Sequence, residues 1–126
     1  MIGYVTLGTN DLDRARGFYD ALFAILGVGR IMEFPSGTVW GTDMGAPSLG
    51  LMTPFNGEAA TVGNGVMVAL EFDSPEKVNA VHAKALELGG KDEGPAGPRG
   101  DSGFYAGYFR DLDGNKLNAF CMVPKA

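Results

Sequence analysis

The chain twice follows an apolar strand pattern with an amphipathic helix pattern. In the first occurrence, residues 2–8 alternate in character and are rich in β-forming side chains, which predicts a strand. Asp11 stands where a helix N-cap is expected, and Gly27 stands where the helix is expected to end. Between them, apolar side chains recur at helical spacing and predict one buried stripe: Leu12, Ala15, Tyr19, Leu22 and Leu26.

The second occurrence has the same order of signals. Residues 66–72 predict a strand, and Ser74 is the expected N-cap of the helix that follows. Pro75 suits the first helical position, where a missing N–H removes no hydrogen bond. Gly89 and Gly90 are expected to end this helix. Its predicted buried stripe is Val78, Val81, Ala85 and Leu88.

Three short extended segments follow each helix, separated by turn residues. They are expected at about 29–34, 37–43 and 48–54 in the first half, and at about 91–94, 104–110 and 115–123 in the second. Residues 111–115, Asp-Leu-Asp-Gly-Asn, signal a hairpin turn because Asp-Gly tolerates positive φ. The Gly- and Pro-rich residues 94–103 predict a mobile loop.

These parallel patterns indicate an internal duplication. The two halves align without a gap at a constant offset of 63, from Val5 to Val68 and on to Gly27 and Gly90. A strand before a capped helix looks similar in unrelated proteins, but here one offset runs through strand, cap and helix. The prediction is an α+β fold in one domain, residues 1–126. It divides into a first module of about 1–55, a linker of 56–65 and a second module of about 66–126.

Composition narrows the classes of function. With 126 residues and 45% hydrophobic content, the chain has enough apolar material for a core without a metal or disulfide. The net charge of −5 argues against a nucleic-acid partner, because phosphate binding needs clustered basic residues. No apolar run approaches the roughly 18 residues of a membrane span, so no membrane partner is expected. The lone Cys121 and the lack of a visible signal peptide predict a reducing, cytoplasmic location.

Two segments carry a resemblance to a known family. The opening Val5-Thr6-Leu7, with residues 11–15 and Phe18-Tyr19, resembles the start of a vicinal oxygen chelate protein, and residues 109–115 resemble the hairpin before that family's last strand. The superfamily includes glyoxalase I, bleomycin- and fosfomycin-resistance proteins and extradiol dioxygenases. The resemblance implies two β-α-β-β-β modules that form a cupped, incomplete β-barrel with the helices outside. It also implies a ligand in the cup and, frequently, a homodimer.

The resemblance also indicates where metal-using members place their ligands. Tyr4 and Met67 stand where the first and fifth strands usually offer histidine, and Asn118 stands where the last strand usually offers glutamate. The fourth position falls on Gly50 or Met52. None of these is a good ligand for a borderline divalent ion, which prefers imidazole, carboxylate or thiolate. The chain is therefore predicted to use no metal and no other cofactor.

Residues with the parity of those ligand positions are expected to line the cup, because successive strand residues alternate between faces. Met67 and Phe120 either line the cup or fill it as core. Trp40, Tyr105 and Tyr108 are additional candidates whose parity the sequence leaves open, and Arg99 is the one cation of the 94–103 loop, placed to meet an anionic group. The positions that share the family parity are Tyr4, Thr6, Met67, Ala69, Asn118 and Phe120.

No catalytic residue can be assigned from the sequence. Glu71 shares the cup parity but is expected at a solvated strand end, and His82, the single histidine, is expected to be structural. Cys121 has the opposite parity and is expected to be a buried thiol. The preferred interpretation is a metal-free protein that binds an aromatic or amphipathic small molecule. The alternative is a lyase or isomerase of the glyoxalase I (lactoylglutathione lyase) type, acting on a carbonyl or thiol-adduct substrate.

Overall fold

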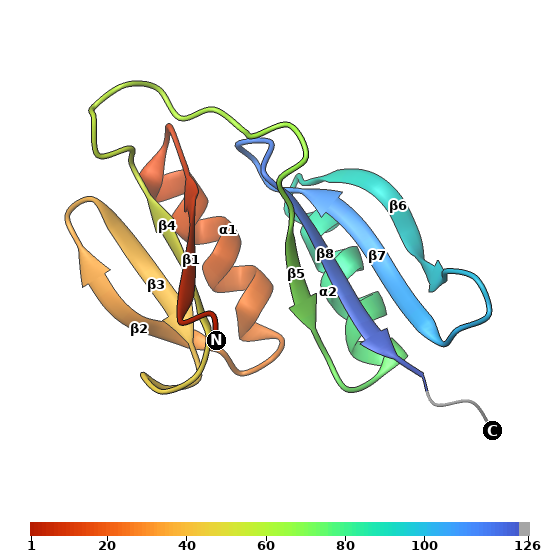
Figure 1. Cartoon of the computed structure of the whole chain (residues 1–126). Coiled ribbons are helices and arrows are strands. Elements are labelled where there is room, and N and C mark those ends of the chain that lie inside the picture. The colour runs from red at the N-terminus through yellow and green to blue at the C-terminus, as the bar shows by residue number, and fades with distance from the viewer. Residues whose placement is uncertain (124–126) are drawn as a thin grey trace. The chain divides into compact units, whose positions relative to one another are not determined.

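The computed structural model describes residues 1–123 and divides into two compact units, Met1–Gly63 and Asn64–Ala126 (Figure 1). Each unit contains one four-stranded sheet and one helix, and in each the helix lies behind its own sheet in the view of Figure 1. The predicted α+β order of strand, helix and three strands therefore occurs twice, as the duplication requires.

The two sheets have the same topology. In the first, the order is β1-β4-β3-β2, and in the second it is β5-β8-β7-β6. The parallel pairs are β1 with β4 and β5 with β8, and the other neighbours are antiparallel. The first unit consists of β1 (Tyr4–Gly8), α1 (Leu12–Ala24), β2 (Gly29–Phe34), β3 (Gly37–Gly41) and β4 (Ser48–Met52). The second consists of β5 (Val68–Glu71), α2 (Pro75–Glu87), β6 (Lys91–Pro98), β7 (Phe104–Arg110) and β8 (Lys116–Met122).

The helix caps are confirmed. The Asp11 carboxylate accepts a hydrogen bond from the Arg14 amide at 3.1 Å, and the Ser74 hydroxyl accepts one from the Lys77 amide at 3.3 Å. Each satisfies one of the amides that a helix leaves unpaired in its first turn. Gly27 and Gly89 adopt positive φ values of 71° and 99°, so both glycines reverse the chain just beyond a helix.

Each helix buries its apolar stripe against one face of its own sheet. In the first unit Tyr19 and Leu22 pack towards Trp40 and Leu51, and all four are fully buried. In the second unit the buried stripe is confirmed at Val78, Val81 and Ala85, which lie over a sheet face with Phe109 and Leu117. We call the other face of each sheet, away from its own helix, the helix-distal face.

Strand β6 differs from its predicted length. The sequence predicted a strand of about 91–94 followed by a mobile loop, whereas β6 runs from Lys91 to Pro98. The extension includes Pro95 and Pro98, which have no backbone donor. Because β6 is the edge of its sheet and pairs only with β7, one side of the strand needs no donors. The register between β6 and β7 is irregular at two places, between Asp92 and Gly94 and between Gly94 and Gly97. The second irregularity contains Pro95, which cannot donate a hydrogen bond to β7.

The helix–sheet contact of the second unit can be tested at Gly107. A Cβ there would lie 2.9 Å from His82 Cδ2, and the His82 ring is held by Asp92 Oδ1 at 3.1 Å and the Tyr108 carbonyl at 3.2 Å. Gly107→Ala should therefore lower the free energy of unfolding by about 1–3 kcal/mol through overpacking. Gly17→Ala is the matched control, because Gly17 lies in α1 with nothing within 4 Å of its added Cβ.

The control should gain up to about 1 kcal/mol from helix propensity. Urea denaturation monitored by circular dichroism measures both changes, with the denaturant slope unchanged if only stability is altered. Equal effects of the two substitutions would contradict the tight contact between α2 and β7.

Candidate functional site

Most of the residues predicted to share one parity lie on helix-distal faces. In the first unit Tyr4 and Thr6 pair with Ser48 and Gly50, opposite in parity to the buried Leu7–Leu51 pair. In the second unit the helix-distal pairs on the central strands are Ala69 with Asn118 and Glu71 with Phe120. Met67 directly precedes β5.

Two of the aromatic candidates lie on the helix side instead. Trp40 is 1% exposed, and its ring packs against Tyr19 with a centroid distance of 5.6 Å. Tyr105 donates its hydroxyl hydrogen bond to Asn79 Oδ1 on α2 at 2.7 Å. Both residues therefore belong to the helix–sheet layer of their units rather than to a helix-distal surface. The register fixes this assignment, since Trp40 pairs with Leu49 and Tyr105 with Cys121.

Trp40 is anchored by an ion pair at the edge of its layer. Asp20 on α1 accepts hydrogen bonds from Trp40 Nε1 at 2.9 Å and from Arg30 Nε at 2.9 Å. The Arg30 guanidinium is the main reason that the pKa of the Asp20 carboxyl lies below its ordinary value, and the Trp40 bond lowers it further while burial opposes both. The indole N–H of a fully buried side chain is thereby satisfied.

Tyr108 and Asn118 form the polar centre of the helix-distal face of the second sheet. They are directly opposite each other in the β7–β8 register. Asn118 is 1% exposed, and its Oδ1 atom has no hydrogen-bond partner within residues 1–123. A buried amide oxygen of this kind normally has a donor, so this position is a candidate for contact with a bound molecule.

Two cations lie over the Tyr108 ring. The Arg99 guanidinium carbon is 5.5 Å from the ring centroid and Lys116 Nζ is 5.6 Å from it. Arg99 is held by main-chain carbonyls: Nη2 donates to Pro95 at 2.6 Å, and Nη1 donates to Gly97 at 3.1 Å. The predicted candidate Arg99 is thus brought to the same face as Tyr108 and Asn118.

Glycine at position 94 makes this arrangement possible. A Cβ on Gly94 would lie 3.3 Å from both Arg99 Nη2 and Tyr108 Cδ2. Lys116 was not among the sequence candidates, although its parity with Asn118, two residues along the same strand, could have identified it. Its approach to Tyr108 depends on the pairing of β7 with β8, which the sequence pattern does not specify at the level of single residues.

Within residues 1–123, the helix-distal faces of the two sheets carry neither the histidine nor the cysteine that general acid–base chemistry could use. His82 is 6% exposed, with Nε2 directed at Asp92 and the Tyr108 carbonyl. Burial raises the pKa of the Cys121 thiol, which lies on the helix side of β8. Glu71 is exposed on the helix-distal face of β5.

The four positions that the resemblance assigns to metal ligands carry a donor set that does not fit a catalytic divalent ion. It consists of the Tyr4 phenol, the Met67 thioether and the Asn118 amide, with Gly50 or Met52 as the fourth member. A phenol must lose a proton of pKa about 10 to ligate well, an amide oxygen is a weak neutral donor, and a thioether suits soft ions. Within residues 1–123, no three His, Cys, Asp or Glu side chains converge as a metal site.

In the described part of the chain, neither helix has the length and apolar character needed to cross a membrane.

Comparison with known proteins gives one consistent result. The family model described as "Glyoxalase/Bleomycin resistance protein/Dioxygenase superfamily" matches residues 1–119. A glyoxalase/bleomycin resistance protein from Albidiferax ferrireducens T118 is 38% identical and superposes with a TM-score of 0.87, over 96% of this chain and 98% of that one. No curated protein matches the chain.

More distant structures share the fold. A glyoxalase-related enzyme from Fulvimarina pelagi is 23% identical with a TM-score of 0.76, over 96% of this chain and 87% of that one. A lactoylglutathione lyase from Agrobacterium tumefaciens is 21% identical with a TM-score of 0.69, over 96% and 92%. The comparisons confirm the predicted fold class and the predicted superfamily.

The role of Asp20 beneath the first sheet can be tested by substitution. Asp20→Ala should lower the free energy of unfolding by about 1–3 kcal/mol, because it leaves the buried Trp40 N–H without an acceptor. Glu33→Ala is the matched control, since it removes the other carboxylate bound to Arg30 from an exposed position, and should change stability by less than about 0.5 kcal/mol. In a Trp40→Phe background, Asp20→Ala should lower the free energy of unfolding by less, because phenylalanine has no N–H to leave unpaired.

The pH dependence of this pair has a defined sign. The pKa of Asp20 is lowered in the folded state, so the ionised carboxylate stabilises the fold. This stabilisation is fully present above the ordinary carboxyl pKa and is lost as the pH falls through the folded-state pKa. The stability gap between the wild type and Asp20→Ala should therefore narrow in acid. Chemical denaturation at neutral and acidic pH measures it, and a gap that widens in acid would refute the assignment.

Proposed function

Because the chain belongs to the glyoxalase/bleomycin resistance protein/dioxygenase superfamily, we propose that it binds a small organic molecule with an aromatic or amphipathic body and uses no catalytic metal. The proposed contacts are residues of the helix-distal faces, together with Met67, which directly precedes β5. They are Tyr4 and Thr6 in the first unit, and Met67, Arg99, Tyr108, Asn118 and Phe120 in the second.

The unpartnered amide oxygen of Asn118 is the observation that carries this proposal. Leaving a buried acceptor without a donor costs about 1–3 kcal/mol, and an apolar side chain of similar size would avoid that cost. A ligand that donates a hydrogen bond to Asn118 Oδ1 would recover the loss. Ligand sites in proteins combine mostly apolar lining with a few such polar groups.

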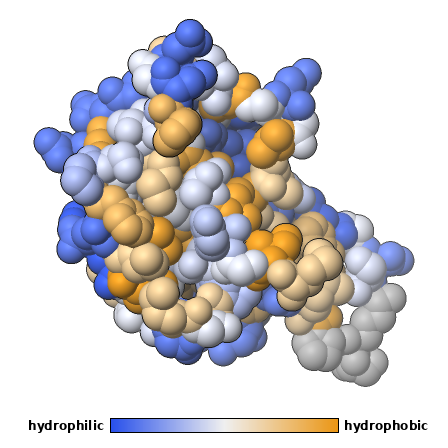
Figure 2. All heavy atoms as spheres, turned by 60° about the vertical axis from the view of Figure 1, so that its left-hand side comes forward, coloured by the Kyte–Doolittle hydropathy of each residue, from blue (hydrophilic) through white to orange (hydrophobic). Residues whose placement is uncertain are grey.

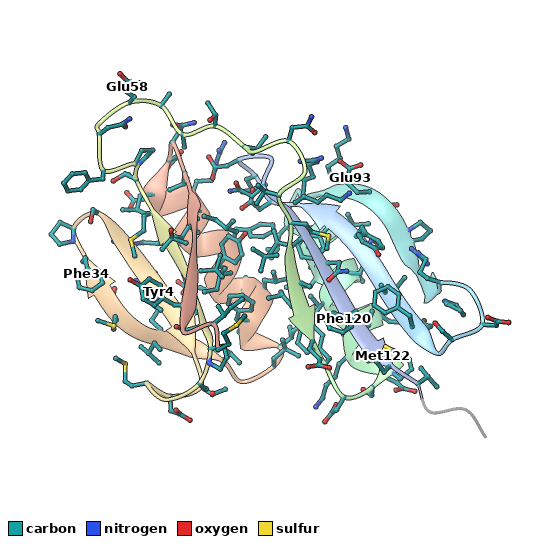
Figure 3. All side chains as sticks on the ribbon, viewed as in Figure 1. Tyr4, Phe34, Glu58, Glu93, Phe120 and Met122 are labelled. Atoms are coloured by element: carbon teal, nitrogen blue, oxygen red, sulfur yellow. The ribbon has the colours of Figure 1, made fainter. Side chains whose placement is uncertain are left out.

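Apolar lining is available beside Asn118. Phe120 and Phe104 on the same face lie with ring centroids 5.6 Å apart. Figure 3 marks Phe120 and Met122 along β8, two residues apart and therefore on the same side of the strand. These side chains supply surface for the apolar body of a ligand.

The first unit also carries accessible apolar side chains. Tyr4 is 68% exposed on β1, and Met32 and Phe34 on β2 are also exposed. Figure 3 marks Tyr4 and Phe34 on this sheet, and Figure 2 shows apolar surface spread among polar side chains on the side it brings forward. Tyr4 and Thr6 are therefore accessible to an amphipathic molecule.

Turnover of the glyoxalase type receives less support. A proton-transfer mechanism needs a base with a pKa near the working pH, within reach of the substrate. His82 on α2 and Cys121 on β8 are both buried between the helix and the sheet of the second unit. Glu71 is an exposed carboxylate. Stoichiometric binding without product therefore suits these residues better than catalysis. Conversion of a 2-oxoaldehyde–thiol adduct would reverse this preference.

We further propose that the protein is a cytoplasmic homodimer. Each sheet ends in edge strands, and an exposed edge is an aggregation risk unless it is covered or paired. A second copy is the simplest partner for such edges. The single cysteine is compatible with a reducing compartment.

Asn118 and Asn115 offer a matched test of binding, since both are buried amides but only Asn115 has its hydrogen bonds satisfied, through Asp111. Asn118→Leu should leave stability unchanged or raise it by about 1–3 kcal/mol, and should weaken aromatic ligands at least tenfold. Asn115→Leu should instead lower stability. Denaturation curves and an NMR screen of neutral and charged aromatic fragments provide the two readouts. Fragments that bind Asn118→Leu as well as the wild type would remove Asn118 from the site.

The metal-free part of the proposal has its own test. After dialysis, the purified protein should hold well under one equivalent of zinc, nickel, manganese or iron, because the donor set suits none of them. Adding these ions should neither raise the melting temperature nor create lactoylglutathione-forming activity. Elemental analysis and thermal denaturation measure this. Stoichiometric metal retained through dialysis, with activity lost on chelation, would return Tyr4 and Asn118 to the role of ligands.

A further inference from the structure

We infer that the helix-distal face of the second sheet binds the oxyanion, a carboxylate or phosphate, of a small molecule that also carries a neighbouring hydroxyl or N–H donor. This inference rests on the proposed function and adds the chemical class of the ligand. It is carried by four residues of one unit, Arg99, Tyr108, Lys116 and Asn118, which we call the distal cluster.

The distal cluster is assembled by the β7–β8 register. Tyr108 lies opposite Asn118, and Lys116 is two residues before Asn118 on the same face of β8. Arg99 and Lys116 each lie within 6 Å of the Tyr108 ring centroid, a distance at which a cation is attracted to the face of an aromatic ring. Two positive charges are therefore held beside one ring.

Within residues 1–123, neither cation has a carboxylate as a direct ion-pair partner. The hydrogen bonds of Arg99 go to the neutral carbonyls of Pro95, Gly97 and Pro98, and neither Arg99 nor Lys116 forms an ion pair there.

The nearby carboxylates have other positions or partners. Glu93 is bound by Arg110, and that hydrogen bond is the main cause of the lowered pKa of Glu93. The charge of Lys116 contributes a smaller part of this lowering, without a direct ion pair between the two side chains. Glu71 pairs in register with Phe120, on the far side of β8 from Tyr108. Two cations that form no ion pair in the described part of the chain thus lie beside one ring, although the net charge of the protein is −5. Such a place attracts an anion.

Arg99 retains donors for this anion. A guanidinium has five N–H groups, and its three contacts with carbonyls leave others available. Guanidinium groups bind carboxylate and phosphate oxygens strongly, and an ammonium such as Lys116 adds a second point charge. The carbonyl contacts and the space left by Gly94 fix Arg99 in advance, so binding requires little further ordering of this segment.

Asn118 adds a second requirement. Its unpartnered Oδ1 is an acceptor, so it repels the oxyanion itself and needs a hydroxyl or N–H group. Residues directly opposite on neighbouring antiparallel strands have Cβ atoms about 5 Å apart. Arg99 lies on the β6 side of Tyr108, whereas Lys116 and Asn118 lie on its β8 side. One small molecule over Tyr108 would therefore place its donor by Asn118 and its oxyanion where both positive charges attract it. An aromatic or apolar body would extend over Phe120.

The inference is tested with four probes and isothermal titration calorimetry on the full chain. The probes are 2-hydroxybenzoate, 2-hydroxyphenyl phosphate, benzoate and the neutral 2-hydroxybenzamide. At least one of the two hydroxyl-bearing anions should bind at least tenfold more tightly than 2-hydroxybenzamide, and 2-hydroxybenzoate more tightly than benzoate. The stronger of the hydroxyl-bearing anions identifies the oxyanion as carboxylate or phosphate. Added salt should weaken the anions and not the amide.

Substitutions locate the charge effect. Arg99→Gln and Lys116→Gln should each weaken the preferred anion about three- to tenfold, and should weaken 2-hydroxybenzamide by a clearly smaller factor. Lys84→Gln on α2 removes the same charge outside the distal cluster and should change neither. Arg99→Lys, which retains the charge, should keep more anion affinity than Arg99→Gln. Melting temperatures of all variants confirm that each is folded.

The failures of the two proposals are distinguishable. If 2-hydroxybenzamide binds as tightly as the anions, or if the glutamine variants weaken all probes alike, the oxyanion inference is overturned while small-molecule binding stands. If neither hydroxyl-bearing anion binds, the inference is likewise overturned. The fragment screen with Asn118→Leu then decides separately whether the protein binds small molecules at all.

Discussion

Each unit of this protein depends on the alternation of side chains along its parallel central strand pair, β1 with β4 and β5 with β8. One face of each sheet must bury the apolar stripe of a helix. The alternate residues of each strand therefore point to the opposite face. A slip of one residue would exchange Leu7 with Thr6, or Leu117 with Asn118, and would place polar groups beneath a helix. The burial of two helices therefore determines which side chains remain for recognition.

The helix-distal face of the second sheet departs from what stability alone would favour. Within residues 1–123, Asn118 buries an amide oxygen that has no donor, and Arg99 and Lys116 lie over one ring without forming an ion pair, although the protein has 15 acidic residues. In the first unit, by contrast, the buried Trp40 N–H and the Arg30 guanidinium both donate hydrogen bonds to the Asp20 carboxylate. This contrast between the two modules supports the proposal that the unsatisfied groups of the second module bind a ligand.

The fold does not depend on the residues at the positions that the resemblance assigns to metal ligands. The helix caps, the helix stripes and the helix-facing strand positions hold each module together, and none of them involves Tyr4, Met67 or Asn118. The helix-distal positions can therefore change chemistry without loss of the β-α-β-β-β unit. A superfamily with this division can keep one architecture and vary its ligands.

The sequence by itself determined the caps at Asp11 and Ser74, the duplication, the shared parity of Tyr4, Thr6 and Asn118, and the centre of each helix stripe, because these depend on local periodicity. It did not identify Phe18 and Phe23 as buried residues of α1. Only the tertiary structure decided that Trp40 and Tyr105 face a helix, that β6 continues through Pro95 to Pro98, and that Lys116 meets Tyr108. Those features depend on the register between strands and on edge position, which turns and bulges set and which local composition does not encode.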